Sequence, residues 1–456
     1  MASVIRRAQP ALDFIPPNYS PLMRRAMGPL MPLWTNWQTN LVEVESRNVE
    51  ALAKLYHEFE LGKTRFLLAF RHPNPTDPYV LSHLLWRDLP QTARQMGLSL
   101  GTTHSHFIYD RGIPLWAGGY LSWLFSRLGG VPIQRGKLDL QALKTARDLF
   151  ANGQFPLAAA PEGGNNGHNE IVSPLEPGIA QLAFWCQEDL IAQERDANVV
   201  ILPLGIQYRY IEAPWQELES MMTRLEAESG LDTESGLDLY GRLYQLASHL
   251  LTLMEGYYQK FYGVTFKAAD ELAGRTDEPM DANDLLAVRL RSLIDEALKV
   301  AEQYFRLRPK GSTIDRCRKL EQAGWDRIFR DDTEKLSPVD RGLADRVAEE
   351  ADFRLWHMRL VESFVAVTGH YVKENPSADR FAETALLLRD MVEKIKNDQH
   401  RQPVTGLQLG PQRAIATVGE PIAIGPLFAD YKAKRRQAIA SLTKDLQEQM
   451  ESLILT

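Results

Sequence analysis

The residues most able to do chemistry are a histidine and an aspartate in the segment His72-Pro-Asn-Pro-Thr-Asp77. An aspartate beside an imidazole can select its tautomer and stabilise the charge that the ring gains when it takes a proton. The two prolines and the asparagine between them favour a turn rather than a helix. No serine or cysteine stands out as a partnered nucleophile, so we expect the proton to come from a substrate. The alternative is a chance pair on a surface loop.

The elements around this pair indicate an α/β domain. An apolar run at 65–70, with the length and Phe/Leu content of a buried strand, ends just before His72. Strands that alternate with helices are typical of a largely parallel sheet. Further strand-like runs lie at 130–134, 155–160 and 199–206. Helical patterns lie at 45–59, 81–96, 138–152 and 177–195.

After residue 210 the pattern becomes almost entirely helical, and a β-rich run at 414–424 followed by a long amphipathic helix returns near the end. We therefore predict a mixed α/β sheet flanked by helices, with a large all-helical insertion. At 456 residues the chain is long enough for such a second body. The predicted divisions are an irregular, amphipathic segment (1–44), the first part of the α/β domain (45–211), the helical insertion (212–405), and the closing strand and helix (406–456).

Composition excludes several classes of function. A net charge of -7 without a basic cluster argues against general binding of nucleic acid. Two cysteines, Cys186 and Cys317, lie far apart and suggest neither a disulfide framework nor a zinc site, so a reducing cytoplasm is the simplest compartment. We expect no signal peptide and no membrane-spanning run. The segment 21–37 either lies on a membrane surface or packs as a helix on the domain, and the apolar segment 112–126 is buried or interfacial.

Three further segments follow apolar runs, where the sites of α/β domains usually form. Arg135 closes the run at 130–134, and its guanidinium either binds a phosphate or carboxylate or forms a surface ion pair. In Pro161-Glu162-Gly163 the glycine permits a sharp turn close to a ligand. Glu162 either bonds to a substrate hydroxyl or braces the loop. Pro203 interrupts the run at 199–206, which is a weak signal alone.

In order and spacing these segments resemble the glycerolipid acyltransferase superfamily, which contains lysophosphatidate and glycerol-3-phosphate acyltransferases. Its blocks are His-x-x-x-x-Asp, Gly-x-x-Phe/Ile-x-Arg, Phe-Pro-Glu-Gly and a Val-Pro-Val/Ile-like strand. The corresponding segments here run from His72 to Asp77, from Gly130 to Arg135, from Pro161 to Gly163, and across Leu202-Pro203. The family's helix start resembles Leu175-Glu-Pro-Gly-Ile-Ala-Gln-Leu-Ala183, and its closing segment resembles Val418-Gly-Glu-Pro-Ile422 with the final helix. The resemblance covers roughly residues 60–210 and 410–456.

The resemblance implies transfer of a fatty acyl group from a thioester, acyl-CoA or acyl carrier protein, to a hydroxyl of a glycerol-phosphate or lysophospholipid-type acceptor. His72 is then the general base and Asp77 its partner. Arg135 is expected to bind the acceptor phosphate, and Glu162 and Gly163 to shape the acceptor pocket. The resemblance implies no metal and no cofactor other than the acyl donor.

The departures from the family pattern concern the acceptor. Arg71 stands where the family usually has Asn, and Gly164-Asn165-Asn166 replaces a common Thr-Arg-Ser, so one expected arginine contact to phosphate is missing. Either the acceptor is not lysophosphatidate, or Arg71 supplies the charge and is itself a substrate-binding residue. The family's usual N-terminal membrane helices are also missing, so we expect a cytoplasmic protein with peripheral membrane contact.

Two rival functions remain open. His104 and His106, with His168 and Asp77, suggest a metal site of a hydrolase, although no carboxylate stands at the usual spacing. The second rival is a catalytically degenerate acyltransferase fold that binds lipid or acts as a scaffold through its helical insertion.

Overall fold

A computed structural model describes residues 5–113, 118–134, 139–232, 236–267, 281–362, 370–396 and 409–455, apart from the side chains at 33 and 36–38. The chain divides into two compact units. We call the first the helical unit, made of Met1–Leu12 and Ala213–Leu409. The second is the α/β unit, made of Asp13–Glu212 and Gly410–Thr456.

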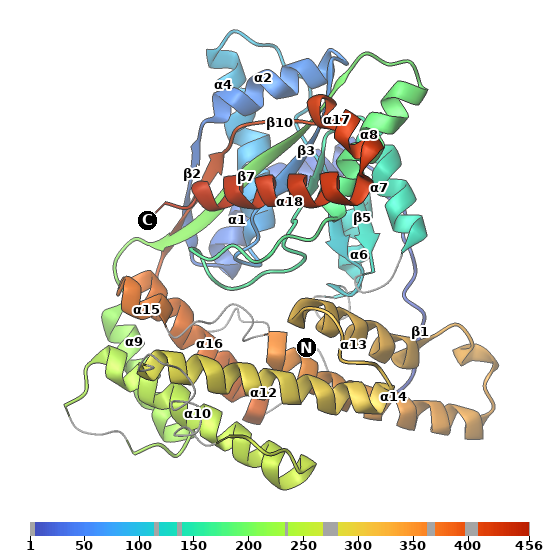
Figure 1. The fold of residues 1–456 in the computed structure, drawn as a ribbon. Coiled ribbons are helices and arrows are strands. Elements are labelled where there is room, and N and C mark those ends of the chain that lie inside the picture. The colour runs from blue at the N-terminus through green and yellow to red at the C-terminus, as the bar shows by residue number, and fades with distance from the viewer. Residues whose placement is uncertain are drawn as a thin grey trace. The chain divides into compact units, whose positions relative to one another are not determined.

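The α/β unit is built on an eight-stranded mixed sheet (Figure 1). Its order is β2-β9-β7-β3-β6-β4-β5, and β10 follows β9 along β7. The strands β7, β3, β6, β4 and β5 run parallel, whereas β9 is antiparallel to β7 and parallel to β2. The predicted fold class is confirmed. The strands are β2 (Leu41–Arg47), β3 (Thr64–Phe70), β4 (His106–Asp110), β5 (Gly130–Ile133), β6 (Leu157–Ala159), β7 (Asn198–Tyr210), β9 (Gln412–Val418) and β10 (Ile422–Ala423).

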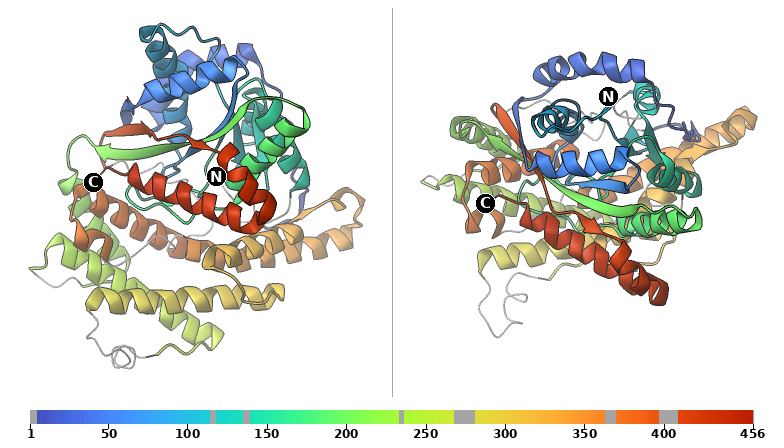
Figure 2. Two further views of the ribbon diagram at one scale, coloured as in Figure 1. Left: turned by 45° about the horizontal axis from the view of Figure 1, so that its top comes forward. Right: turned by 90° about the horizontal axis from the view of Figure 1, so that it is seen from above.

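Helices cover both faces of this sheet, so the unit has three layers (Figures 1 and 2). One core joins a sheet face to α2, α3, the π-helical turn η1 and α4, and the other joins the opposite face to α7, α8, α17 and α18. The helices of the unit are α1 (Pro21–Gln38), α2 (Val49–Glu60), α3 (Asp77–His83), η1 (Leu84–Asp88), α4 (Leu89–Gln95), α6 (Tyr120–Arg127), α7 (Leu140–Asn152), α8 (Gly178–Ala192), α17 (Phe428–Ala433) and α18 (Arg435–Ser452), with a 3-10 turn at Gly425–Leu427.

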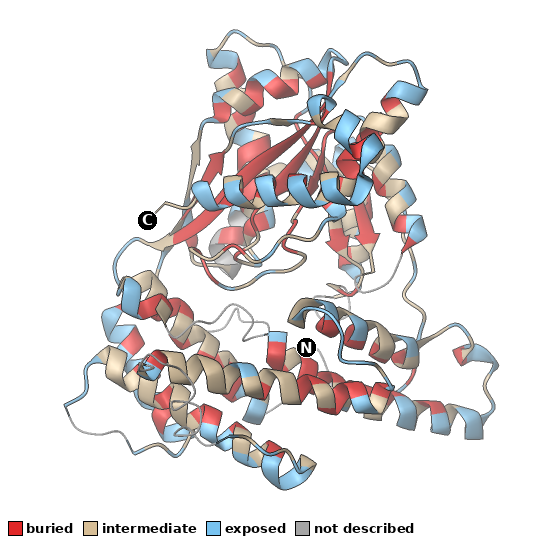
Figure 3. Cartoon of the chain, in the orientation of Figure 1, coloured by how far each residue is buried: buried red, intermediate tan, exposed pale blue. Residues whose placement is uncertain are grey.

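The central strand β3 explains the continuous apolar run before His72. Phe66 and Leu68 face one core, and Leu67 and Ala69 face the other, because successive side chains of a strand point to opposite faces. Every residue of β3 is buried (Figure 3). A strand covered on both faces can be apolar at every position. The sequence therefore predicts it from a continuous apolar run and not from alternating apolar and polar residues.

Pro203 does not break its strand. β7 is continuous from Asn198 to Tyr210, and Pro203 pairs with Ala69 of β3. On its other side the pairing changes from β9 to β10, and the Pro203 carbonyl accepts the backbone N–H of Gly419 (2.9 Å). A proline is tolerated here because its missing N–H falls where the neighbouring ladder is interrupted.

The structure differs from the sequence prediction near the N-terminus. Residues 21–38, predicted as part of an irregular, amphipathic segment with a helix as one alternative, form the helix α1. Its first turn is capped by Ser20, which accepts the N–H of Met23 (3.3 Å). The helical pattern predicted from residue 45 is wrong at its start, because 41–47 form β2. This strand lies at the edge of the sheet and is only partly covered, so its apolar pattern is weak. β4 and α6 were also not predicted.

The predicted helix at 81–96 is longer than expected and contains a π-turn. It comprises α3, η1 and α4 in succession, from Asp77 to Gln95. The N–H of Leu89 reaches the carbonyl of Leu84, five residues earlier. Pro90 follows immediately and has no N–H to donate, so the wider turn lies where the regular ladder would lose a bond.

The helical unit consists, in its described residues, of helices and one short parallel pairing of β1 (Gln9–Pro10) with β8 (Phe329–Arg330). Ser377 caps the start of the helix at 378–396, since its hydroxyl accepts the N–H of Arg380 (3.3 Å). None of the helices in the described residues is long and apolar enough to cross a bilayer. The helices are α9 (Trp215–Glu228), α10 (Leu239–Tyr262), α12 (Ala282–Phe305), α13 (Thr313–Ile328), α14 (Pro338–Glu362), α15 (His370–Glu374) and α16 (Ala378–Lys396), with a 3-10 turn at Thr333–Lys335.

Arg65 joins the start of β3 to the end of α7. Its Nε donates to the carbonyl of Phe150 (2.8 Å), and its Nη2 donates to those of Leu149 (3.2 Å) and Gly153 (2.8 Å). Burial lowers the pKa of Arg65 to about 10, so the side chain stays charged at neutral pH. The last carbonyls of a helix have no partner within the helix, and a cation at this end is favourable.

We expect Arg65→Met to lower the free energy of unfolding by about 3 kcal/mol, because three carbonyls near the end of α7 lose a charged donor. Urea denaturation followed by circular dichroism measures this. The matched control is Arg94→Met, which removes an exposed bond to the Pro90 carbonyl and should cost less than about 0.5 kcal/mol. Equal losses in the two variants would contradict the assignment.

Candidate functional site

The candidate site lies at the carboxyl end of β3, in the loop 71–76. The N–H of Arg71 extends the sheet by donating to the Leu204 carbonyl (2.9 Å). Asn74 then closes the turn: its carbonyl accepts the N–H of Asp77 (3.1 Å), and its side-chain oxygen accepts that of Thr76 (3.0 Å). Asp77 is the first residue of α3. The Pro-Asn-Pro sequence thus forms the turn that places His72 and Asp77 side by side.

The predicted pair is in hydrogen-bond contact. His72 Nδ1 lies 2.7 Å from Asp77 Oδ2, and the Asp77 side chain is fully buried while that of His72 is 25% exposed. An ionised carboxylate only accepts hydrogen bonds, so Nδ1 carries the proton and Nε2 is left as the nitrogen that can accept one. The arrangement therefore suits a general base. That His72 and Asp77 act in this way stays a prediction.

Tyr208 also contacts the pair, and the sequence did not indicate it. Its hydroxyl donates to Asp77 Oδ1 (2.6 Å) and lies 2.9 Å from Thr76 Oγ1. Burial, together with the nearby charge of Asp77, raises the pKa of Tyr208 well above its ordinary value, so the hydroxyl keeps its proton. No motif surrounds Tyr208 in the sequence. It reaches the site only because β7 lies next to β3.

Glu162 braces the histidine from the loop after β6. Its Oε1 accepts the backbone N–H of His72 (2.8 Å), and its Oε2 accepts the N–H of Ser173 (2.9 Å) and a proton of Asn166 Nδ2 (3.3 Å). Burial raises the pKa of Glu162, and the charge of Arg71 opposes this shift. Of the two alternatives raised for Glu162, the structure contains the bracing contacts. A bond to a substrate hydroxyl stays a prediction.

Gly163 follows Glu162 with a φ of +70°. This left-handed conformation is unfavourable for residues with a side chain, so a glycine is required for the sharp turn that aims Glu162 at the histidine loop. Its contribution to an acceptor pocket stays a prediction.

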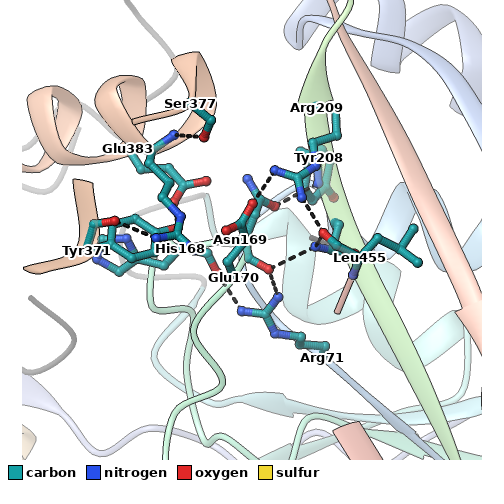
Figure 4. Close-up of polar contacts among 12 residues, drawn as sticks. Arg71, His168, Asn169, Glu170, Tyr208, Arg209, Tyr371, Ser377, Glu383 and Leu455 are labelled. Atoms are coloured by element: carbon teal, nitrogen blue, oxygen red, sulfur yellow. Dashed lines mark hydrogen bonds and ion pairs between the residues drawn. The ribbon is translucent and has the colours of Figure 1, made fainter. Parts of the chain in front are cut away.

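Arg71 is fully buried, and its guanidinium lies against the loop after Gly163 (Figure 4). Nη2 donates to the carbonyls of His168 (2.6 Å) and Ile171 (2.5 Å), and Nη1 donates to that of Asn169. Arg71 thus holds the loop in place. Substrate binding by Arg71 stays a prediction, and the guanidinium would have to leave these carbonyls to reach a substrate phosphate.

The loop that departs from the family pattern is anchored by its own asparagines. Asn166 Nδ2 donates to the Ile171 carbonyl (2.6 Å), and its Oδ1 accepts the N–H of His168 (3.0 Å). Asn169 Oδ1 accepts the backbone N–H of Tyr208 (2.7 Å). Figure 4 shows Asn169 and Glu170 next to Arg71 and to Tyr208 and Arg209 of β7. The segment after Glu162 is therefore joined to both β3 and β7.

Arg135 lies outside the described residues. The residues on either side of its loop are described: Asp139 Oδ2 accepts the N–H of Gln134 (3.1 Å), and Arg111 donates to the same oxygen. Gln134, Asp139 and Arg111 are therefore joined to one another beside the carboxyl end of β5. Phosphate binding by Arg135 stays a prediction.

Two histidines of the rival metal site, His104 and His106, are engaged in other bonds. His104 Nε2 donates to the Leu128 carbonyl (2.8 Å), and its Nδ1 faces the indole N–H of Trp86 (3.2 Å). His106 Nδ1 lies 3.0 Å from the Gly129 carbonyl. These contacts fit a structural role for His104 and His106, in the core beside β4.

Across the described residues, the one cluster of three ligand-type side chains is Asp281, Asp284 and His370 in the helical unit. Asp281 and Asp284 form the capping box of α12, and Asp281 also bonds to Lys373 (2.7 Å). These bonds explain the cluster without a metal ion.

His104 should make stability depend on pH. Burial lowers the pKa of His104 to about 3, whereas an exposed histidine titrates near pH 6.5. As the pH falls from about 6.5 toward 3, the unfolded chain takes a proton that the folded chain refuses, so stability is lost. We expect a slope of up to about 1.4 kcal/mol per pH unit from this residue. Urea denaturation of wild type and His104→Gln across this range measures it, and an unchanged slope in the variant would contradict the prediction.

Comparison with known proteins identifies one family. A family model described as Acyltransferase matches residues 43–207. The match spans β2 to most of β7 and includes His72, Asp77, Glu162 and Gly163. Comparisons with curated proteins and with solved structures returned no match. The family supports a general acyltransferase activity. Residues 43–207 of this chain thus form a domain of the acyltransferase family, which belongs to the glycerolipid acyltransferase superfamily.

Proposed function

We propose that the protein transfers a fatty acyl group from a thioester to a hydroxyl of a glycerol-phosphate or lysophospholipid-type acceptor. The observation that carries the proposal is the 2.7 Å contact of His72 with the fully buried Asp77 inside an acyltransferase-family domain. The carboxylate sets the tautomer of the ring, and the partial exposure of His72 leaves the ring open to a substrate.

In this reaction the acceptor hydroxyl attacks the thioester carbonyl while its proton passes to His72 Nε2. The C–O bond forms, and the negative charge moves onto the carbonyl oxygen. When the tetrahedral intermediate collapses, the C–S bond breaks, and the departing thiolate takes the proton from the imidazolium. The products are the acyl ester and a free thiol, and His72 returns to its starting state. Asp77 stabilises the imidazolium between the two proton transfers.

The proposed substrates follow from the same chemistry. A thioester is already activated, so the reaction needs no cofactor beyond the donor, which is acyl-CoA or acyl carrier protein, and no metal. Arg135 would pair with the acceptor phosphate as a planar, bidentate donor. Glu162 and Gly163 would form one wall of the acceptor pocket, since Glu162 accepts the backbone N–H of His72 and Gly163 turns the chain directly after it.

We also propose that the α/β unit binds the surface of an anionic membrane through α1 and α6. Leu22 (77%) and Leu30 (51%) on α1, and Tyr120 (61%) and Trp123 (53%) on α6, are exposed. The N–H of Ser20 donates to the Arg127 carbonyl (2.8 Å), so the start of α1 lies at the end of α6. Neither helix contains an acidic residue. Exposed apolar and aromatic side chains with only basic charges suit an interface with anionic lipid.

His72→Ala should lower kcat by roughly 10²–10⁴-fold, the usual contribution of a general base. The measurement is thiol release and acyl-ester formation with acyl-CoA and acyl carrier protein donors, against glycerol phosphate and several lysolipids. The control is His249→Ala, which removes a partly buried histidine of the helical unit and should leave the rate unchanged.

A wild-type rate that survives His72→Ala would contradict the mechanism. No turnover with any donor and acceptor would favour the alternative, a catalytically degenerate fold that binds lipid or acts as a scaffold.

Leu22→Glu combined with Leu30→Glu should reduce binding to vesicles of phosphatidylglycerol and phosphatidylcholine by at least about tenfold, because two charges replace apolar contacts on the exposed face of α1. Vesicle co-sedimentation measures this. The matched control is Val339→Glu with Leu343→Glu on α14, where both side chains are also exposed (73% and 63%). Equal losses in the two double variants would count against a specific role for α1.

A further inference from the structure

The buried carboxylate of Asp77 accepts hydrogen bonds from three donors, which come from two parts of the chain. Oδ2 accepts from His72 Nδ1 (2.7 Å) and from the backbone N–H of Asn74 (3.1 Å), and Oδ1 accepts from the hydroxyl of Tyr208 (2.6 Å). The first two donors belong to the same loop as Asp77. Tyr208 is the donor that comes from a different part of the chain, on β7.

Tyr208 is itself held firmly. It is 1% exposed, its register places it opposite Ala414 of β9, and its backbone N–H donates to Asn169 Oδ1 (2.7 Å). The carboxylate is attached to the short helix α3, whereas the tyrosine belongs to a long strand in the interior of the sheet. The bond between them therefore ties the loop 71–76 and the start of α3 to a buried, paired strand of the sheet.

Tyr208 acts as a donor to Asp77, because burial and the nearby charge of Asp77 raise the pKa of its hydroxyl well above the ordinary value. Without this bond, Oδ1 would be a buried oxygen carrying part of a negative charge and lacking its tyrosine donor. The carboxylate could then rotate about its Cβ–Cγ bond, whose torsion has a broad energy minimum. The orientation of the carboxylate toward His72 Nδ1 would no longer be fixed.

We propose that Tyr208 is a positioning residue for acyl transfer: its hydroxyl fixes the orientation of Asp77 and, through it, that of His72. This inference rests on the proposed function. Tyr208 lies behind the carboxylate and touches no reacting atom, so its loss affects the step in which the imidazolium forms and leaves the affinity for both substrates in place.

The test is Tyr208→Phe, which removes one oxygen and keeps the ring. We expect kcat to fall roughly tenfold with KM unchanged for donor and acceptor, the size expected when part of a charge-assisted hydrogen bond is lost. The matched control is Tyr56→Phe, which removes another buried tyrosine hydroxyl of the same unit, bonded to the backbone of His104 (3.0 Å). This control should lose stability without losing kcat.

A second readout does not depend on turnover. In protein labelled with [¹⁵N]histidine, the Nδ1–H resonance of His72 is assigned by its disappearance in His72→Ala. We expect Tyr208→Phe to shift this resonance and to speed its exchange with water, because the Asp77 acceptor is no longer fixed. Tyr56→Phe should leave the resonance unchanged. If Tyr208→Phe fails to fold, Thr76→Val, which removes a hydroxyl 2.9 Å from that of Tyr208, should shift it in the same direction by less.

The outcomes separate the two proposals. If wild type shows no acyl transfer but Tyr208→Phe shows the expected shift of the His72 Nδ1–H resonance, the acyl-transfer function is overturned and the positioning role is retained. A different result would overturn the positioning role alone. In that case wild type is active, His72→Ala is inactive, and Tyr208→Phe keeps both the kcat and the His72 resonance of wild type. A rise in KM with kcat unchanged would also overturn it, since it would place Tyr208 in substrate binding.

Discussion

A buried carboxylate is costly unless hydrogen-bond donors surround it, and Asp77 has such donors from two places in the fold. Its own loop contributes the imidazole of His72 and the amide of Asn74, and β7 contributes the hydroxyl of Tyr208. The candidate site therefore exists only when β3 and β7 are paired. The rest of the α/β unit can be understood as the structure that keeps this pairing in place.

The second support comes from the loop after β6, which holds the main chain on the other side of the histidine. Glu162 accepts the N–H of His72, and Arg71, its neighbour in sequence, donates to the carbonyls of the same loop. The two charged side chains cross between the β3 and β6 loops in opposite directions. Each is buried, and each satisfies backbone groups that would otherwise lack partners. Arg71 and Asn166, which depart from the family pattern, both contribute hydrogen bonds to the loop after β6. These hydrogen bonds hold the loop in place beside His72.

This arrangement separates the chemistry from the recognition of substrate. The proposed base His72, its partner Asp77 and the residues that hold them lie at the carboxyl ends of β3 and β6 and on the neighbouring β7. The predicted phosphate ligand Arg135 follows β5 in the sequence, outside the described residues, and α1 and α6 of the same unit carry exposed apolar side chains. The acceptor could therefore change between members of a family through its loops while the pair at the end of β3 stays the same.

The sequence by itself determined the fold class, most strands of the sheet and the pairing of His72 with Asp77, because these depend on local features. A run of seven residues buried on both faces has a recognisable composition, and a Pro-Asn-Pro turn brings neighbours in sequence together. The edge strand β2 was missed because a half-covered strand has a weak apolar pattern. Only the tertiary structure decided the roles of Arg71 and Tyr208. An arginine next to the histidine could point to solvent, to substrate or into the protein, and a tyrosine 131 residues from Asp77 has no local signal at all. Arg71 finds its partners in the loop after β6, and Tyr208 reaches Asp77 through the register of β7 against β3, so both roles depend on contacts distant in sequence.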